Sequence, residues 1–547
     1  MPEPIIDDQY TAARAYFLCV VGLLFFESFI RIPIYFLELR NHGHPVIKSS
    51  QNHFLLTTYI HKLLTYPSLL PFFTDYPLST LLRLSFFIAL NVLWGYNSIE
   101  FTTDYKLYGW LCIANGGLAL LLASRTNLFS LVARIPSPVL LLYHRWIGIA
   151  TVAHATAHFA LNIQHDIETE QLADAVTNRR IQVGIMAWIA LALIFVTSVN
   201  FIRRRWFEAF YYSHALFFVF VVGALIHATK GPEFLLPGLL LWGIDRAIRF
   251  VNNFRAVNVH SVTVLPGDVT KFKFEGRSVT HPGQMAWLQI PSVSLVNWHP
   301  FTIASAPGDK ESTIAIRGLG GYTKRLERLA SAQESKHTST ISTSMESSFS
   351  HPSIKIRLDG PYGVGGTRWG LHPVTILVAG GIGITPGISI ATHIIQRASL
   401  APSSRSAYDT WHIHLLWVIK DIRHTSWFAS ELASLSSLAT AATLPVTFDI
   451  TICVSGTKAS VNANSPGSEE ESYEMATPYH YSGPGIIVNG RPNMKTYFEQ
   501  VKDARMCLDT IVNVCGPRPL INDVRRAAAG VSCKMSHFHV EEEVFEL

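Results

Sequence analysis

The sequence has few charged residues and no paired cysteines. Of its 547 residues only 15% are charged and 49% are hydrophobic, whereas a typical soluble domain has about 25% charged residues. The six cysteines are scattered without a CxxC pair, which argues against a zinc site or a disulfide framework. The net charge of +5 is small for this length and does not suggest nucleic-acid binding. These shortages indicate a membrane protein, and the length allows two to four domains.

Seven apolar stretches are predicted to cross a bilayer as helices. They lie near residues 15–38, 78–97, 107–124, 138–161, 183–202, 209–228 and 233–251. Arginines follow the third, fifth and seventh stretches, whereas the connection at 162–180 is mainly acidic. Because cytosolic loops carry the excess of basic residues, we expect the N-terminus outside and everything after about residue 252 in the cytosol. The chain is then an integral, multi-pass membrane protein in contact with lipid.

Two pairs of histidines lie within these stretches. His144 and His158 are fourteen residues apart, and His214 and His227 are thirteen apart. Each pair spans roughly 20 Å of helix, and fourteen residues bring the second histidine to within about 40° of the first one's face. Thirteen residues do not, so the second helix needs a local bulge, a rotation or a tilt of the group it binds. Ionisable residues inside a membrane are rare and usually functional.

The spacing of the histidines favours haem among the metals that imidazole binds. Imidazole suits haem iron, copper or zinc, but tetrahedral zinc needs ligands gathered at one point rather than at two levels. A haem fills the gap between two helices and takes one histidine from each. We therefore predict two haems of b type, an inner one on His144 and His214 and an outer one on His158 and His227. The alternative is four unrelated histidines satisfied by their neighbours. His154, one turn before His158, is expected to be structural.

The character of the sequence changes after residue 252. Short segments separated by Pro and Gly predict an antiparallel barrel over 253–368. From about residue 373 the order strand, Gly-rich turn, helix, strand predicts a doubly wound α/β domain over 369–547. The polar tracts 331–350 and 457–484 are predicted to be disordered loops. The membrane part divides into N-terminal helices at 1–106 and the histidine-bearing helices at 107–252.

A set of motifs in the C-terminal half resembles the ferric-reductase and NADPH-oxidase superfamily. They are HPFTIAS, IRGLGGYT, LDGPYG, AGGIGITP, GRPN and CGPRP, in this order, after the two histidine pairs. HRWIG, directly after Tyr143, looks more like the fungal-type ferric or cupric chelate reductases of that superfamily. The resemblance implies a ferredoxin-NADP reductase-like module, with FAD on the barrel and NADPH on the α/β domain.

The resemblance also implies roles for individual residues. In the first motif His299 would contact the FAD pyrophosphate, and Phe301, which follows Pro300, would stack on the isoalloxazine ring. Thr302 would form a hydrogen bond near N5 of the flavin, and Ser305 would support these residues. The FAD phosphates would lie on Gly320, Gly321, Tyr322 and Thr323. The NADPH pyrophosphate would lie on Gly380, Gly381, Gly383, Thr385 and Pro386, and its 2′-phosphate on Arg491, because guanidinium suits a phosphate. Cys515, followed by Gly516 and Pro517, would lie beside the nicotinamide. The expected catalytic residues are Thr302, Ser305 and Cys515; Phe545 matches a terminal aromatic.

The function that the resemblance implies is transmembrane electron transfer. An NADPH-dependent ferric-chelate reductase would move electrons from cytosolic NADPH through FAD and two haems to a ferric or cupric chelate outside, at the plasma membrane. A superoxide-forming NADPH oxidase is the alternative, and a non-catalytic scaffold is a further one. Four acidic residues in the outer connection, Asp166, Glu168, Glu170 and Asp174, would attract metal cations.

Overall fold

The computed structural model divides into two compact units, one of helices up to Val251 and one from Asn252 onward. It describes residues 6, 8–40, 78–96, 102–132, 135, 137–253, 257–341, 354–363, 369, 372–400, 410–443, 445–456, 481–505, 508–533 and 536–543, with backbone alone for 27–40, 79, 138 and 333–341. Phe545 and the tract 457–480 lie outside the described residues.

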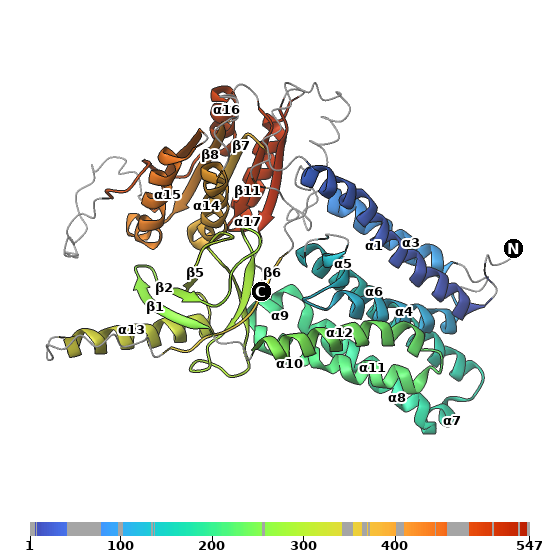
Figure 1. The fold of residues 1–547 in the computed structure, drawn as a ribbon. Helices are drawn as coiled ribbons and strands as arrows, with labels where there is room; N and C mark the ends of the chain where they lie inside the picture. The colour runs from blue at the N-terminus through green and yellow to red at the C-terminus, as the bar shows by residue number, and fades with distance from the viewer. Residues whose placement is uncertain are drawn as a thin grey trace, which may run out of the picture. The chain divides into compact units, whose positions relative to one another are not determined.

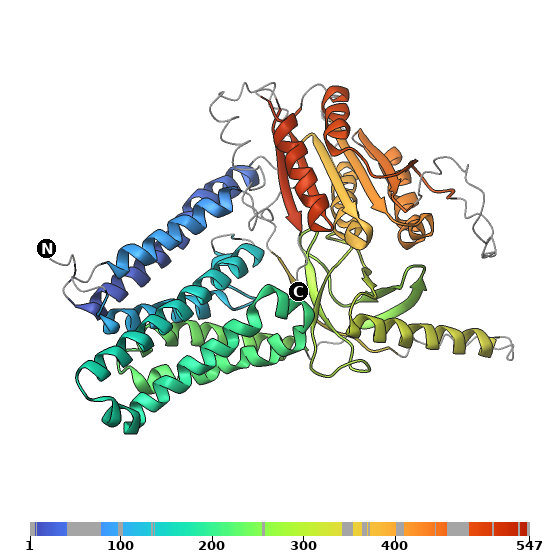
Figure 2. The ribbon, with the colours of Figure 1, turned by 180° about the vertical axis from the view of Figure 1, so that it is seen from behind.

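All seven apolar stretches are helical. The long helices are α1 (Gln9–Arg40), α3 (Leu78–Gly95), α4 (Tyr105–Leu122), α6 (Ser137–Glu168), α8 (Arg179–Ser198), α10 (Phe207–Ser213) with α11 (Phe217–His227), and α12 (Pro232–Asn253). Short helices connect them: α5 (Leu128–Leu131), α7 (Leu172–Thr177) and α9 (Asn200–Arg205). Helices α4, α6, α8 and α11 run alongside one another (Figures 1 and 2).

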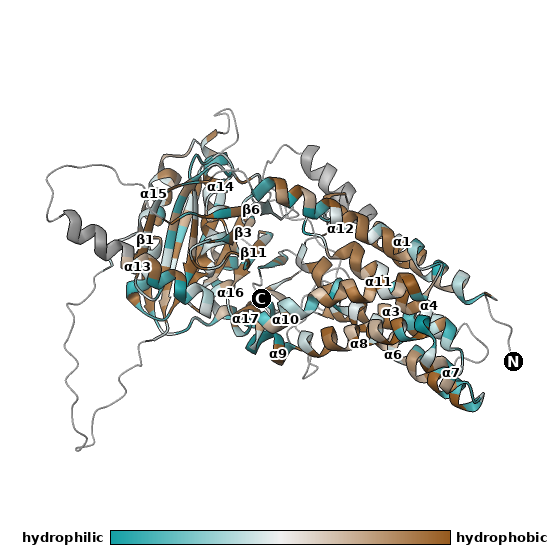
Figure 3. Cartoon of the chain, turned by 90° about the horizontal axis from the view of Figure 1, so that it is seen from below, coloured by the Kyte–Doolittle hydropathy of each residue, from teal (hydrophilic) through white to brown (hydrophobic). Residues whose placement is uncertain are grey.

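Apolar residues predominate along these helices (Figure 3). Within the described residues, three helical segments are long and apolar enough to cross a membrane by themselves: Gln9–Phe26, Arg179–Ser198 and Phe207–His227. Thr80–Gly95 is a shorter apolar helix. Exposed side chains such as Leu193, Phe218 and Leu240 continue this apolar surface, which suits lipid rather than water.

Buried polar side chains join four of the helices. The hydroxyl of Tyr16 on α1 donates to the side-chain oxygen of Asn91 on α3 or of Asn115 on α4, at 3.0 and 2.8 Å. His154 on α6 lies 3.0 Å from the same Asn91 oxygen. Hydrogen bonds between side chains hold helices together where the surroundings are apolar. His154 therefore has the structural position expected for it.

The barrel consists of two antiparallel sheets of three strands. One has the order β1 (Asn258–Leu265), β2 (Val269–Glu275), β5 (Ser312–Arg317), and the other β4 (His299–Thr302), β3 (Met285–Gln289), β6 (Arg357–Tyr362). A bridge between Ile303 and Ile314 joins the sheets. Helix α13 (Gly321–Ile341) follows β5, and its first turns close the core of the barrel with Tyr322, Leu326 and Ala330.

The C-terminal domain has a parallel sheet with helices on both faces. Its strand order is β10 (Ile486–Asn489), β9 (Val446–Val454), β8 (Trp411–Ile419), β7 (Val374–Gly380), β11 (Thr510–Cys515), β12 (Phe538–Glu543). Helices α14 (Ile384–Leu400) and α15 (Ala429–Ala441) share one core with the sheet, and α16 (Met494–Ala504) and α17 (Arg518–Val531) share another. The predicted fold class, helical membrane bundle, barrel and doubly wound domain, is confirmed.

Two predicted loops turn out to be partly helical. Residues 331–341 continue helix α13, because Lys, Arg, Leu, Glu, Ala and Gln in its sequence favour helix more than the following serines oppose it. Helix α6 continues to Glu168, so the acidic connection is shorter than expected. Asp166 is buried there and accepts a hydrogen bond from Asn162 at 2.9 Å. It is therefore not available to attract cations, unlike the exposed Glu168, Glu170 and Asp174.

Candidate functional site

The four membrane histidines face one another in the two expected pairs. The ring centres of His144 on α6 and His214 are 6.1 Å apart, and those of His158 on α6 and His227 on α11 are also 6.1 Å apart. A metal bound at about 2 Å by each of two imidazole nitrogens separates the nitrogens by about 4 Å, and the ring radii account for the remainder. Each pair is therefore spaced to hold one metal ion between two rings.

Hydrogen bonds fix the protonation of three of the rings. The Nδ1 atoms of His144, His158 and His227 lie 2.8, 2.6 and 3.0 Å from the backbone oxygens of Ala119, Tyr105 and Arg180. A carbonyl oxygen only accepts hydrogen bonds, so Nδ1 carries the hydrogen, and in a neutral imidazole Nε2 keeps its lone pair. This is how a ligating histidine is oriented in metal sites.

The outer pair lines a cavity that suits a flat apolar group. The cavity is about 370 Å³ and contains His158 and His227 among side chains such as Trp110, Phe159 and Trp188. Two cations, Lys106 and Arg180, also line it. Apolar walls, opposed imidazoles and cations that would neutralise carboxylates fit a haem with its propionates.

The inner pair is completed by an irregularity in the second helix. A 3₁₀ turn at His214–Leu216 separates α10 from α11. Each residue of a 3₁₀ turn advances about 120° rather than about 100°, which rotates His227 toward the face of His214. The local irregularity that the thirteen-residue spacing requires is thus present. Among the described residues the buried Nδ1 of His214 has no hydrogen-bond partner, which leaves this ring free to adjust to a ligand.

The HPFTIAS motif, the expected flavin site, contains a buried hydroxyl that has no hydrogen-bond partner among the described residues. Thr302 ends strand β4 and is 5% exposed, and its Oγ1 has no hydrogen-bond partner among the described residues. The Ser305 hydroxyl, in contrast, accepts from the amide of Thr313 at 2.9 Å. An unsatisfied buried hydroxyl costs about 1–3 kcal/mol, so the Thr302 site fits a cofactor that supplies the missing partner, as FAD would.

The expected FAD phosphate loop leads into a helix. Gly321 begins helix α13, and a Cβ at Gly320 or Gly321 would meet nothing within 4 Å. Open backbone at a helix N-terminus suits a phosphate. The Tyr322 ring packs on the His299 ring at 4.3 Å, and its hydroxyl accepts from the amide of Ile290. Burial raises the pKa of Tyr322 to about 12, so this hydroxyl stays neutral.

The two nucleotide motifs meet where the strand order reverses. Strands β7 and β11 are neighbours, with Ala379 opposite Cys515, although they are separated by more than a hundred residues of sequence. A Cβ at Gly383 would lie 2.5 Å from the Cys515 carbonyl oxygen, and one at Gly380 would lie 2.8 Å from Pro517. Glycine is required for this close approach. Ligands of doubly wound domains bind at such a switch point, beyond the carboxyl ends of the strands.

Three family models match successive parts of the chain. Residues 108–225 match the ferric reductase like transmembrane component, residues 254–365 an FAD-binding domain, and residues 372–529 the ferric reductase NAD binding domain. The chain belongs to the ferric-reductase and NADPH-oxidase superfamily. It is an integral membrane protein with FAD-binding and NAD-binding domains.

Members of this superfamily from plants and animals are similar to parts of the chain. Ferric reduction oxidase 3, mitochondrial, of Arabidopsis thaliana is 30% identical over 51% of this chain and 37% of its own length. NADPH oxidase 1 of Mus musculus is 24% identical over 66% of each, and NADPH oxidase 5 of Homo sapiens is 30% identical over 52% of this chain and 43% of its own length. The chain thus spans less than two thirds of the length of these relatives. A ferredoxin NADP+ reductase from Neisseria gonorrhoeae matches 52% of this chain and 95% of its own, with a TM-score of 0.30 and 13% identity.

Sequence reasoning missed one residue of this ferric-reductase-like site, Glu543. It ends strand β12 opposite Cys515 and accepts from the side chain of Asn513 at 3.2 Å. A Cβ at Gly283 of the barrel would lie 3.1 Å from its carboxylate. Burial raises the pKa of Glu543 to about 8. Burial, and to a smaller extent the neighbouring Glu543 carboxylate, holds the pKa of the Cys515 thiol well above its ordinary value. Both groups are therefore uncharged at pH 7. The run of glutamates near the C-terminus was the available signal.

The remaining nucleotide-site residues of this superfamily member are spread along the same edge of the sheet. Thr385 and Pro386 are buried in the first turn of α14. Arg491 is exposed just after β10, three strands from β7 in the sheet order. With strands about 4.8 Å apart, it lies roughly 14 Å across the sheet from the glycine loop. That separation leaves room for the adenosine half of a dinucleotide between them.

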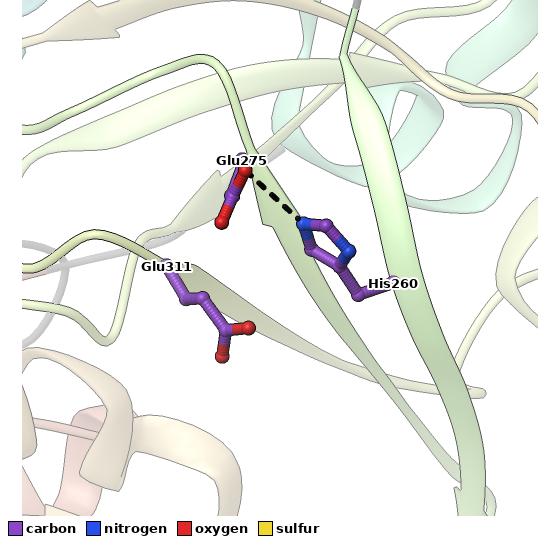
Figure 4. Close-up of side chains that lie close together, drawn as sticks. All are labelled: His260, Glu275 and Glu311. Atoms are coloured by element: carbon purple, nitrogen blue, oxygen red, sulfur yellow. Dashed lines mark ion pairs between the residues drawn. The ribbon is translucent and has the colours of Figure 1, made fainter.

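A separate cluster of potential metal ligands lies on the barrel surface of this chain. His260, Glu275 and Glu311 have ligand atoms within 4.8 Å of one another, and all three are exposed (Figure 4). His260 forms an ion pair with Glu275 at 3.5 Å. This ion pair accounts for two of the three residues, His260 and Glu275, without a metal.

Proposed function

We propose that this chain transfers electrons from NADPH to a ferric or cupric chelate on the other side of a membrane. The observation that carries the proposal is the pair of opposed histidine rings at each of two levels in the helices, in one chain with a flavin and nucleotide module. The barrel would hold FAD, which would supply the conversion of a hydride into single electrons. His144 with His214 and His158 with His227 would hold two haems, which would supply single-electron transfer across the helices. In sum, one NADPH and two ferric ions give NADP+, one proton and two ferrous ions.

The residues of the cytosolic module would align the nicotinamide with the flavin. The glycine loop at Gly380–Gly383 and the N-terminus of α14 would hold the pyrophosphate, and Arg491 would hold the 2′-phosphate. Thr302 would donate its free hydroxyl hydrogen to the flavin near N5. Cys515 and Glu543, both uncharged at pH 7, would border the nicotinamide.

The outer face supports a chelate as the acceptor. His158 and His227 would both be engaged in holding the outer haem, so the acceptor would receive its electron without binding the iron. Two of the outer connections that the structure describes in full are short, namely 169–178 and 228–231, and these two offer little material for a lid. Exposed Glu168, Glu170 and Asp174 would attract metal cations, while Lys106 and Arg180 line the cavity itself.

A superoxide-forming NADPH oxidase is the second candidate. Of the relatives compared above, NADPH oxidase 1 of Mus musculus matches the largest share of the chain, 66%. Oxygen would be reduced at the same haem edge, so the two functions differ in acceptor and not in the path of the electrons.

An acceptor assay separates the two functions. Membranes containing the chain are supplied with NADPH and a ferric chelate, once without oxygen and once with superoxide dismutase. A chelate reductase keeps its rate of ferrous formation under both conditions. If reduction stops under either, superoxide is the reductant and the oxidase function holds. Membranes with the His158→Ala variant control for other reductases, because they lack the outer ligand.

A further inference from the structure

The two outer histidines are held in the same way by two different helices. His158 on α6 reaches the carbonyl oxygen of Tyr105, the first residue of α4, at 2.6 Å. His227, the last residue of α11, reaches the carbonyl oxygen of Arg180, the second residue of α8, at 3.0 Å. In both cases the ring donates from Nδ1 to the first turn of a neighbouring helix.

A glycine lies four residues after each accepting carbonyl. Gly109 follows Tyr105 on α4, and Gly184 follows Arg180 on α8. In a helix the amide of residue i+4 already bonds to carbonyl i, but the oxygen has a second lone pair. The Cβ of residue i+4 tilts back toward that oxygen and stands in the way of a second donor. Glycine has no Cβ and leaves the approach open.

The space at both glycines is already filled by the histidine rings. A Cβ at Gly109 would lie 3.0 Å from Nδ1 and 3.1 Å from Cε1 of His158. A Cβ at Gly184 would lie 2.8 Å from Nδ1 and 2.9 Å from Cε1 of His227. These separations are shorter than ordinary van der Waals contact. Alanine at either position would therefore displace the ring from its carbonyl.

We propose that Gly109 and Gly184 are positioning residues, which seat His158 and His227 on backbone carbonyls and so direct both Nε2 atoms into the shared cavity. This inference rests on the proposed haem function. Donation from Nδ1 makes the imidazole a more basic ligand, which stabilises ferric iron and lowers the midpoint potential of the outer haem. The glycines thereby set both the occupancy and the potential of the outer centre.

The inner pair is built differently, which makes the inference specific. His144 donates from Nδ1 to the carbonyl of Ala119 at 2.8 Å. Helix α4 ends just beyond, and the amide of Ala123 turns to Leu120 instead. The end of the helix therefore frees the Ala119 carbonyl, and no glycine is needed there. Changes at Gly109 and Gly184 should act on the outer centre alone.

The test uses the full-length protein in detergent, with Gly109→Ala and Gly184→Ala. Reduced-minus-oxidised spectra and a spectroelectrochemical titration give the occupancy and midpoint potential of each haem. Each variant should lose half of the haem absorbance or shift its outer component to higher potential, with the inner component unchanged. Gly243→Ala is the matched control, because Gly243 is an exposed helical glycine whose Cβ would meet nothing within 4 Å. It should behave as the wild type.

The outcomes distinguish the proposed role of the two glycines from the assignment of the histidines as haem ligands. Wild-type occupancy and potentials in both glycine variants would overturn the proposal. If His158→Ala also keeps both haems, the ligand assignment fails and the proposed function with it. If Gly109→Ala loses both haems while His158→Ala keeps the inner one, then misfolding and not displacement of His158 explains the loss, and the proposal is rejected for that glycine.

Discussion

At the scale of single residues, the flavin motif contains two hydroxyls with opposite roles. Thr302→Val removes a buried hydroxyl without a partner, so flavin-depleted protein should gain about 1 kcal/mol of unfolding free energy. Ser305→Ala removes the acceptor of the Thr313 amide and should lose about 1 kcal/mol. Chemical denaturation measures both. The holoprotein with Thr302→Val should also reduce its flavin more slowly in stopped-flow. A loss of stability in both variants would contradict the conclusion that the Thr302 hydroxyl has no hydrogen-bond partner in the flavin-free protein.

Glu543 should make the stability of the folded chain depend on pH. Its pKa is raised from 4.5 to about 8 by burial, so between these values the unfolded chain loses a proton that the folded chain keeps. Its contribution to stability is complete below about pH 4.5 and is lost as the pH rises toward 8, by about 3 kcal/mol at pH 7. Glu543→Gln does not titrate and should flatten the fall in melting temperature from pH 5 to 8. Equal slopes for both proteins would refute the raised pKa.

Arg491 should decide the choice of coenzyme. Only NADPH carries the 2′-phosphate, and a charge-assisted hydrogen bond contributes about 1.5–3 kcal/mol, or about tenfold or more in affinity. Arg491→Ala should therefore raise the KM for NADPH by about tenfold and leave the KM for NADH nearly unchanged. Steady-state kinetics with both coenzymes measures this. The same two KM values are measured for Lys420→Ala, because Lys420 is a second cation and directly follows β8. Equal increases for the two coenzymes would exclude the role.

At the scale of elements, helix α6 carries one ligand of each proposed haem. His144→Ala and His214→Ala should remove the inner haem, and His158→Ala and His227→Ala the outer one. Difference spectra should lose half of the b-type signal, or all of it if one haem cannot assemble without the other. His154→Ala is the control on the same helix, because His154 bonds to Asn91 and should cost stability rather than haem. An undiminished spectrum in any of the four would reject that ligand.

At the scale of the whole molecule, the arginines after the third, fifth and seventh stretches predict which side binds NADPH. Sealed right-side-out vesicles should reduce an external chelate only when NADPH is inside, because NADPH does not cross the bilayer. External NADPH should become active only after a low concentration of detergent opens the vesicles. Activity with external NADPH in intact vesicles would show that the orientation is reversed.

The sequence alone determined the features that depend on short-range spacing. Apolar runs and histidines fourteen and thirteen residues apart predicted the helices and their pairing, and strand–glycine–helix order predicted the nucleotide domain. Such patterns suffice because helix and strand periods act within a few residues. The roles of Arg491, Cys515 and the flavin motif remain predictions from the resemblance.

Only the tertiary structure decided the features that depend on contacts between distant segments. Glu543 lies beside Cys515 because β12 pairs with β11, and no local pattern distinguishes it from the neighbouring glutamates. The positions of the His158 and His227 rings depend on α4 and α8, each of which places a carbonyl and a glycine against a ring from α6 or α11. A glycine in an apolar helix is compatible with many neighbours, and its partner is known only once the helices are packed. Burial, which sets the charge of Glu543 and leaves Thr302 unpaired, is likewise a property of the assembled fold.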